Sequence, residues 1–323
     1  MKIIGTGSAL PELAVTNDML SEIFDTNHEW IYSRTGIAQR RILSNDTLID
    51  LAVMAAQNAL TDAKLQPTDI DFLICANVVN PFITPGLGCV IQGKIGANCP
   101  CIDINSACSG FIFALDMANA YLQAGKAKNI LIVCAEEISK IINWNFRDAS
   151  VLFGDGSGAA VVTNGNNLKA ILLHTTSAVE PLYCKREGSK TPYSKNDTCT
   201  PQILDGLTMN GKDVYKMAVN AATKDVNTII NKANLTSKDI SFFLLHQANV
   251  RIMDTIRDHL GEKDEKFPKN IQKYGNTSAA SIPILLDELN KEGKLKNGDL
   301  LLMCAFGAGF SSGACIIEWN LKQ

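Results

Sequence analysis

Apolar residues along the chain alternate between short continuous runs and longer stretches with a period near 3.6 residues. The run Cys101–Ile104 has the pattern of a buried strand, and the apolar positions that follow it recur at helical spacing. Helices are predicted in this way over roughly 48–63, 110–124, 213–231, 248–260 and 280–291. Strands that alternate with helices indicate an α/β protein with mostly parallel sheets and helices packed on them.

Two distant parts of the chain repeat one another at an offset of 170 residues. "GKAKNILIVCA" lies over "GKLKNGDLLLMCA", which pairs Cys134 with Cys304, and at the same offset Cys108 lies over Ser278. A constant offset across separated segments favours duplication over the chance recurrence of strand–helix patterns. Loops at the carboxyl ends of matching strands then meet near a pseudo-twofold axis, where α/β sheets usually place their sites. The chain is expected to contain two related halves, 1–165 and 166–323.

The composition is that of an ordinary globular protein and argues against several functional classes. Of the 323 residues, 46% are hydrophobic and 20% are charged, and the net charge of −3 gives no overall field for nucleic acid. No apolar run approaches the roughly 20 residues of a membrane helix, and the N-terminus is poor as a signal peptide. The ten cysteines are therefore expected to be reduced in the cytoplasm. "CPC" at 99–101 has no second pair at zinc-finger spacing, so no metal site is expected.

Cys108 lies where the predicted strand gives way to the helix 110–124, among the small residues of "SACSG". A thiol at a helix N-terminus faces the positive end of the helix dipole and unpaired N–H groups, which favour the thiolate. We therefore expect a lowered pKa, a nucleophilic sulfur and room for a substrate beside it. Position alone leaves open that Cys108 is a buried structural cysteine.

Two further candidates lie in the second half of the chain. His246 ends the apolar run of "FFLLHQAN", and Asn276 precedes a helix of small residues in "YGNTSAAS". Taken singly, His246 could be a core histidine and Asn276 a helix N-cap. Because Cys108, His246 and Asn276 all lie on loops predicted at strand ends, a shared site is favoured.

The motifs "SACSGF", "HQAN" and "YGNTSAAS", in this order, resemble the signatures of the β-ketoacyl-acyl-carrier-protein synthase III family. The resemblance runs essentially end to end and includes "KIIGTGSALPE", "EWIYSRTGI", "FGDGSGAAVV" and "AFGAGF". It implies a thiolase-like fold of two pseudo-repeated halves in α-β-α-β-α layers. It also implies a homodimer with the loop around 80–90 at the subunit contact, and no cofactor, because the CoA thioester is a substrate.

The reaction implied by the resemblance is a decarboxylative Claisen condensation of an acyl-CoA primer with malonyl-acyl carrier protein. This reaction releases CoA and CO2 and initiates fatty acid synthesis. Cys108 would carry the acyl group, while His246 and Asn276 would donate hydrogen bonds to the enolate oxygen. Phe306 matches an aromatic residue beside the nucleophile. Backbone N–H groups of Cys108 and of the loop near Ala308 would form a second oxyanion hole.

The resemblance also implies residues that bind the CoA moiety. Trp30 and Arg147 would enclose the adenine ring, and Arg34 would pair with phosphate. Without the resemblance, Trp30 would be interpreted as core and Arg34 as a solvated charge. The positions that match the lining of the pantetheine tunnel are Met209, Gly211 and Asn249.

Two features concern the primer and the carrier protein. Thr84 stands where several acetyl-using members carry phenylalanine, which predicts a deeper acyl pocket and a primer longer than acetyl, although Phe82 could refill the space. The carrier protein is acidic, so a local basic patch is expected. The candidate residues for this patch are Lys216, Arg251 and Arg257.

Other functions stay open at this point. A condensing or acyl-transferring enzyme of secondary metabolism would keep the same fold and nucleophile. Thiolase-like or hydroxymethylglutaryl-CoA-synthase-like chemistry uses a different residue set. A non-catalytic acyl-CoA-binding protein would be marked by a degenerate site, whereas all three catalytic residue types are present here.

Overall fold

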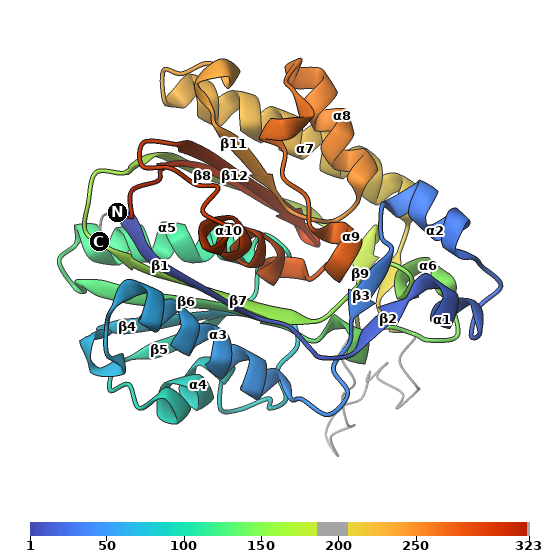
Figure 1. Cartoon of the computed structure of the whole chain (residues 1–323), viewed down its shortest axis with the longest axis horizontal. Helices are drawn as coiled ribbons and strands as arrows, with labels where there is room; N and C mark the ends of the chain where they lie inside the picture. The colour runs from blue at the N-terminus through green and yellow to red at the C-terminus, as the bar shows by residue number, and fades with distance from the viewer. Residues whose placement is uncertain (186–205, 322–323) are drawn as a thin grey trace, which may run out of the picture.

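The computed structural model describes residues 1–185 and 206–321, which form two sheets with helices between and outside them (Figure 1). The first sheet has the order β1 (Lys2–Ala9), β7 (Gly156–Thr163), β6 (Asn129–Glu136), β4 (Phe72–Ala76) and β5 (Cys101–Ile104). The second sheet has the order β11 (Phe242–Leu245), β12 (Leu300–Gly307), β13 (Gly309–Glu318) and β8 (Leu168–Ala178). The first sheet therefore uses strands from residues 2–163 and the second uses strands from 168–318.

The two sheets repeat one strand order. Counted from one edge of each sheet, the first sheet has the order β1, β7, β6, β4, and the second has the matching order β8, β13, β12, β11. The first sheet has one further strand, β5, after β4. The 3-10 helices Pro67–Asp69 and Ser237–Asp239, which precede β4 and β11, complete the correspondence. The prediction of two pseudo-repeated halves in a layered α/β fold is confirmed.

The prediction of mostly parallel sheets is wrong. Only β4 with β5 and β6, and β11 with β12, pair in parallel, whereas β7 and β13 are antiparallel to both of their neighbours. A turn at Ala308 joins β12 to β13, which leaves no room for the crossover that a parallel pair requires. The connection from β6 to β7 holds only the 3-10 helix Ile138–Lys140 and the four-residue α6 (Arg147–Ser150).

The helices α5 (Gly110–Gln123) and α10 (Ser281–Lys291) form the central layer, between the two sheets (Figure 1). Phe111 and Leu115 of α5 and Leu286 of α10 are fully buried, in one cluster with Ile132 of the first sheet and Leu301 of the second. Each helix is apolar on several sides because it packs against both sheets.

The outer layers consist of α3 (Leu48–Ala63) and α4 (Leu87–Ile95) on the first sheet, and of α7 (Gly211–Lys232) and α8 (Val250–Leu260) on the second. Thr47 and Asp50 form a capping box that starts α3, and Asn249 caps α8. Gly5 and Gly7 in β1 allow close packing, because a Cβ at either position would lie 2.4 or 2.3 Å from a backbone oxygen of α3.

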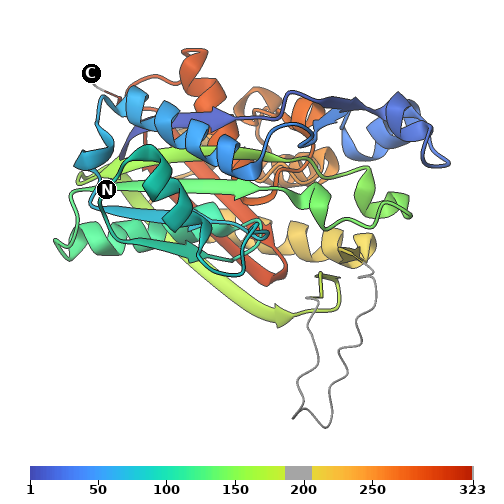
Figure 2. The ribbon, with the colours of Figure 1, turned by 90° about the horizontal axis from the view of Figure 1, so that it is seen from below.

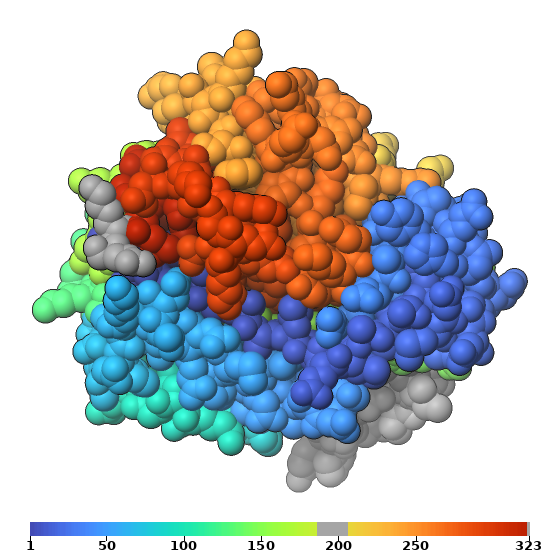
Figure 3. All heavy atoms as spheres, in the orientation of Figure 1, coloured from blue at the N-terminus to red at the C-terminus, as the bar shows by residue number. Residues whose placement is uncertain are grey.

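A group of short elements lies at one end of the layers (Figures 1 and 2). The α2 segment contacts α8, and β3 contacts α9. In Figure 3 the N-terminal part of this group, which includes α2 and is drawn in blue, lies directly against the orange surface of the second half. The elements are α1 (Asn17–Ser21), α2 (His28–Thr35), α9 (Ile271–Tyr274), the pair β2 (Ala14–Thr16) and β3 (Gln39–Arg41), and the pair β9 (Leu182–Tyr183) and β10 (Thr208–Met209).

Candidate active site

A cavity at the strand ends of both sheets is lined by the three residues predicted to carry chemistry. Cys108 comes from the loop between β5 and α5, His246 directly follows β11, and Asn276 follows α9. Phe306 and Gly307, at the end of β12, line the same cavity. The first half of the chain thus contributes a thiol, and the second half contributes groups that can donate hydrogen bonds to a substrate oxygen beside it.

The backbone around Cys108 is held by close contacts with small residues. Ala107 has a φ of 47°, which turns the chain just before the cysteine. A Cβ at Gly307 would lie 2.6 Å from the Cys108 nitrogen, so glycine lets the end of β12 approach the nucleophile's backbone. Gly110 has a similar role, because a Cβ there would lie 3.0 Å from Ala76 Cβ.

The pKa of Cys108 is raised to about 12, so the predicted lowering is wrong. Burial is the largest cause, because a thiolate removed from water loses its hydration. The Ser278 hydroxyl, which donates to the sulfur at 3.4 Å, acts in the opposite direction, and the nearby Glu136 raises the pKa further. The resting group is therefore a thiol, whose proton must leave before the sulfur can attack.

His246 is buried, with 2% of its surface exposed, and its orientation is set by Ser281. Its Nδ1 lies 2.8 Å from Ser281 Oγ, which accepts a hydrogen bond from the Gln247 N–H. We assign the ring hydrogen to Nε2, the tautomer in which Nδ1 accepts the proton of the serine hydroxyl. Burial lowers the pKa of His246 to about 3, so the ring is neutral at neutral pH. A neutral imidazole with a hydrogen on Nε2 can donate a hydrogen bond to a substrate oxygen in the cavity.

Asn276 is 6% exposed, and its amide orientation follows from its backbone neighbours. Its Oδ1 accepts a hydrogen bond from the Ser278 N–H at 2.9 Å, so the Nδ2 donors are left for the cavity. The Asn276 backbone is bonded to Leu152 and Gly154, which fixes it against the first half of the chain. This residue too is placed as a donor.

Phe306 packs edge-on against His246, with ring centroids 5.4 Å apart and planes at 70°. The phenylalanine is buried and lines the cavity beside Cys108, as the sequence predicts. Ala308 is half-buried in the turn after β12 and is not among the residues that line the cavity. The neighbouring Gly307 is the residue in that turn region that touches the backbone of Cys108.

The residues predicted to bind the CoA moiety lie in two connected places. Met209, Gly211 and Asn249 line the cavity itself. Asn249 Nδ2 donates to the backbone oxygen of Arg34 at 3.2 Å, which connects the cavity to α2.

On α2, Trp30 is stacked with two arginines. The guanidinium carbon of Arg34 lies 4.5 Å from the centroid of the indole, and that of Arg147 lies 4.4 Å from it. Trp30 and Arg34 share a helix face because they are four residues apart. The predicted group of one aromatic ring and two cations is therefore assembled beside the cavity.

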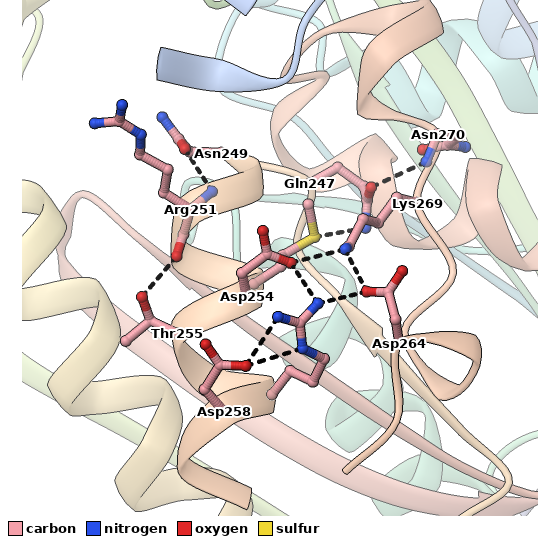
Figure 4. A network of polar contacts seen from close by, with 11 residues as sticks. Gln247, Asn249, Arg251, Asp254, Thr255, Asp258, Asp264, Lys269 and Asn270 are labelled. Atoms are coloured by element: carbon pink, nitrogen blue, oxygen red, sulfur yellow. Dashed lines mark hydrogen bonds and ion pairs between the residues drawn. The ribbon is translucent and has the colours of Figure 1, made fainter. Parts of the chain in front are cut away.

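The three predicted docking residues differ in their surroundings. Lys216 and Arg251 are exposed, and Arg251 Nη2 donates to the backbone oxygen of Ser33 at 3.1 Å. Arg257, in contrast, is surrounded by carboxylates, and Arg251 points away from this group (Figure 4). The ion pairs of Arg257 reach Asp254 at 3.0 Å, Asp258 at 2.8 Å and Asp264 at 2.6 Å. Its charge is compensated within the chain, so the structure does not present Arg257 as a free cation.

Thr84 lies on an exposed loop and does not line the cavity of its own subunit. Its neighbours Phe82 and Ile83 are 45% and 84% exposed, which is unusual for large apolar side chains. Thr84 can therefore shape an acyl pocket only if this loop reaches the cavity of another subunit.

Three residues of the site were not predicted as functional. Glu136, Ser278 and Ser281 are all buried and bonded to each other or to Cys108 and His246. A signal for Glu136 was present in the sequence, since a carboxylate ends the otherwise apolar run "ILIVCAE". Ser278 was matched to Cys108 by the repeat, but its contact with the sulfur depends on how the halves pack.

Within residues 1–185 and 206–321, no helix is long and apolar enough to cross a membrane. The same described residues contain no group of three His, Cys, Asp or Glu side chains that could hold a metal ion.

Comparisons with known proteins place this site in a family. Residues 102–179 match the family model of 3-oxoacyl-[acyl-carrier-protein (ACP)] synthase III, and 230–319 match the model of its C-terminal part. The β-ketoacyl-[acyl-carrier-protein] synthase III of Clostridium acetobutylicum is 40% identical over 99% of both chains. The chain belongs to the synthase III family. It is an acyltransferase, a condensing enzyme that initiates fatty acid synthesis.

Solved structures of synthase III enzymes share the fold. The enzyme from Aquifex aeolicus superposes with a TM-score of 0.91 at 40% identity, covering 98% of this chain and 99% of that chain. The priming β-ketosynthase of the R1128 polyketide pathway gives a TM-score of 0.91 at 31% identity, covering 99% and 96%. The synthase III fold is therefore shared with an enzyme of secondary metabolism, but the relative at 40% identity over the full chain is a synthase III by name.

Proposed function

We propose that this synthase III condenses an acyl-CoA primer with malonyl-acyl carrier protein through an acyl group held on Cys108. The observation that carries the proposal is the cavity in which the Cys108 sulfur faces two donors, His246 and Asn276, from the other half. The products are a β-ketoacyl-carrier protein, CoA and CO2. No cofactor takes part in the proposal, because the thioester itself is the activated group.

In the first half-reaction, the Cys108 sulfur attacks the carbonyl carbon of the acyl-CoA thioester. The bond between that carbon and the CoA sulfur breaks, and one thioester replaces another. The developing oxyanion is placed near the Cys108 backbone, where Gly307 allows the end of β12 to approach. A bound acyl group would lie against the ring of Phe306.

In the second half-reaction, malonyl-carrier protein loses CO2, and its thioester oxygen becomes an enolate. The His246 Nε2–H and the Asn276 Nδ2–H stabilise this negative charge, and both are held in place before the substrate arrives. The enolate carbon then attacks the acyl carbon, and Cys108 leaves as the thiolate. A neutral His246 suits this role, because its lowered pKa leaves one ring hydrogen, which the assigned tautomer donates from Nε2.

For CoA recognition, we propose that the adenine ring inserts beside Trp30. Two guanidinium groups, those of Arg34 and Arg147, already lie over this ring. An adenine that enters between Trp30 and Arg147 would keep the stacking while Arg34 pairs with phosphate. The tunnel to Cys108 would then pass Asn249, Gly211 and Met209.

The carrier protein is proposed to dock on Lys216 and Arg251, the two predicted cations that remain exposed. Arg251 lies at the start of α8, next to Asn249 of the cavity. We no longer assign Arg257 to docking, because three carboxylates compensate its charge.

A homodimer is also part of the proposal. The exposed Phe82 and Ile83 flank Thr84, and Ile102 is 41% exposed on β5, which forms the edge of the first sheet. An unpaired edge strand with an apolar loop beside it is a surface that a second copy can cover. Thr84 of one subunit would then enlarge the primer pocket of the other. The proposed location is the cytoplasm, consistent with the free thiols of all nine described cysteines.

The boundary that we propose between the related halves, at residue 165, lies between the end of β7 and the start of β8.

One experiment tests the catalytic proposal. The protein is incubated with acetyl-, isobutyryl- and octanoyl-CoA, and its mass is measured before and after malonyl-carrier protein is added. We expect an acyl mass on Cys108 that disappears on the second addition. No acyl mass from any of these thioesters would refute the proposal, and a Cys108→Ser variant controls for acylation elsewhere.

A further inference from the structure

Glu136 is a buried carboxylate at the end of β6 that the mechanism above does not use. Its residue is 0% exposed, yet three donors surround its oxygens. The Val78 N–H bonds to Oε2 at 3.0 Å, and Ser278 Oγ and the Ala279 N–H bond to Oε1 at 2.9 and 3.4 Å. A carboxylate that accepts this many hydrogen bonds inside a protein is held in one position and can exist as the anion.

Ser278 lies between this carboxylate and the nucleophile. Its Oγ is 2.9 Å from Glu136 Oε1 and 3.4 Å from Cys108 Sγ. A hydroxyl has one proton, so it cannot donate to both neighbours at once. When it donates to the carboxylate, its oxygen is free to accept the hydrogen of the Cys108 thiol. The three groups then form a continuous path from the sulfur to the carboxylate.

The other candidate for a base on Cys108 is His246, and its contacts argue against that role. Its Nδ1 is bonded to Ser281, and in the tautomer assigned above its Nε2 carries the ring hydrogen, so neither nitrogen then offers a lone pair to the thiol. The Cys108 thiol still has to lose its proton in the acylation step.

We propose that Glu136, acting through Ser278, accepts the proton of Cys108 when the sulfur attacks and returns it when the sulfur leaves. The thiol proton passes to Ser278 Oγ, while the serine proton passes to Glu136 Oε1. The sulfur electron pair then forms the bond to the acyl carbon, and CoA departs with the electron pair of the broken bond. After condensation, the electron pair of the broken acyl bond returns to Cys108, and both protons move back. The inference rests on the proposed function, in which Cys108 is acylated and released.

The surroundings of Glu136 determine when it is ionised. The ionisable groups that face it are Asp155 and the thiols of Cys75, Cys108 and Cys134, which are all acids. Burial raises the pKa of Glu136 to about 8, while its three hydrogen bonds act against this rise. The fraction of Glu136 that is ionised, and so able to accept a proton, therefore increases toward pH 8.

The test compares Ser278→Ala and Glu136→Gln with the wild-type protein in two assays. The first is the rate at which iodoacetamide alkylates Cys108 between pH 6 and 10, measured by mass spectrometry without any substrate. The second is the rate of acylation by acyl-CoA in a single turnover. The matched control is Ser157→Ala, which removes another buried serine hydroxyl, one that is bonded to the Cys134 carbonyl oxygen and not to Cys108, Ser278 or Glu136.

We expect both variants to acylate about 100-fold more slowly near pH 7, the usual scale of a lost general base. In the wild type, alkylation should level off above about pH 8 as Glu136 becomes ionised. In the variants it should keep rising with pH, because only hydroxide then removes the thiol proton. Ser157→Ala should match the wild type in both assays.

Wild-type acylation rates and an unchanged alkylation profile in Ser278→Ala would overturn the inference. If Glu136→Gln does not fold, Ser278→Ala decides alone, because it removes the hydroxyl and leaves the carboxylate in place. Failure of the proposed function looks different, since the wild-type protein itself would then take no acyl group while its alkylation profile is still measurable.

Discussion

Replacing Ser281 by alanine should slow the second of the two proposed half-reactions and leave the first unchanged. The hydroxyl of Ser281 lies 2.8 Å from His246 Nδ1, and it also accepts the Gln247 N–H at 3.4 Å. Without it, nothing directs the imidazole hydrogen to Nε2, and the tautomer with Nδ1–H becomes accessible. In that tautomer, Nε2 presents a lone pair to the enolate oxygen and can no longer stabilise it.

The size of the effect follows from the lost hydrogen bond. A hydrogen bond between neutral groups contributes about 1 kcal/mol net, which is about fivefold in a rate. Condensation should therefore slow about fivefold or more in Ser281→Ala. Acylation of Cys108 should keep its rate, because the carboxylate path through Ser278 does not include Ser281.

The assay loads Cys108 with an acyl group, removes free acyl-CoA, and adds malonyl-carrier protein. Rapid quenching and mass spectrometry then follow the loss of the acyl mass. Thermal unfolding of the same variant shows whether it is folded, and Ser157→Ala again controls for deletion of a buried hydroxyl. If the acyl group leaves Ser281→Ala as fast as it leaves the wild type, the argument from the tautomer of His246 is refuted.

Four other predictions can be tested with single variants. Trp30→Ala should raise the KM for acyl-CoA about fivefold, because the loss of about 1 kcal/mol of stacking weakens binding by that factor. An unchanged KM would contradict the proposed adenine site. Arg251→Glu should raise the KM for malonyl-carrier protein and weaken its salt dependence, whereas Arg257→Gln should leave both unchanged but lower the Tm by about 2 °C. Thr84→Phe should shift the ratio of acylation rates toward acetyl-CoA over octanoyl-CoA, and an unaltered ratio argues against the shared pocket. Folding raises the pKa of Glu136 to about 8, so the protonated carboxyl stabilises the folded state at low pH, and this stabilisation is lost as the pH rises through 8. Glu136→Gln has no such proton to lose. Its free energy of unfolding should therefore decline less between pH 5 and 8 than that of the wild type.

The helices could be predicted because they depend on local patterns, whereas the site residues were predicted from motifs that resemble those of a known family. The predicted helix 48–63 has the bounds of α3, and 110–124 differs from α5 by one residue. Capping residues such as Asn249, which shortens the predicted 248–260 helix by two residues, are the main source of error at the ends. Strand direction was harder to predict, because apolar runs look alike in parallel and antiparallel pairs. The turn at Ala308 that makes β12 and β13 antiparallel is a single residue.

Whether an arginine is neutralised by nearby carboxylates was harder to predict than where it lies along a helix. Arg251 and Arg257 are six residues apart on one helix, but only Arg257 meets Asp264, which comes from the following 3-10 helix. The number of nearby acids in the sequence does not determine which cation they neutralise. Rotation of the side chains around the helix and the return of the chain beside it decide that outcome.

The pKa of Cys108 shows how the duplication produces both the site and the wrong prediction. Cys108 and Ser278 occupy equivalent positions 170 residues apart, and the Ser278 hydroxyl touches the sulfur. A left-handed backbone is found at Ser278, with a φ of 50°, and beside the nucleophile at Ala107, with a φ of 47°. The contact between these two similar junctions leaves Cys108 partly buried, and this desolvation opposes the helix terminus that should favour a thiolate. The same packing brings Glu136, from the first half, within reach of Ser278 of the second. A position can thus be predicted from one half of the chain, but the chemistry at that position depends on the contact between the two halves.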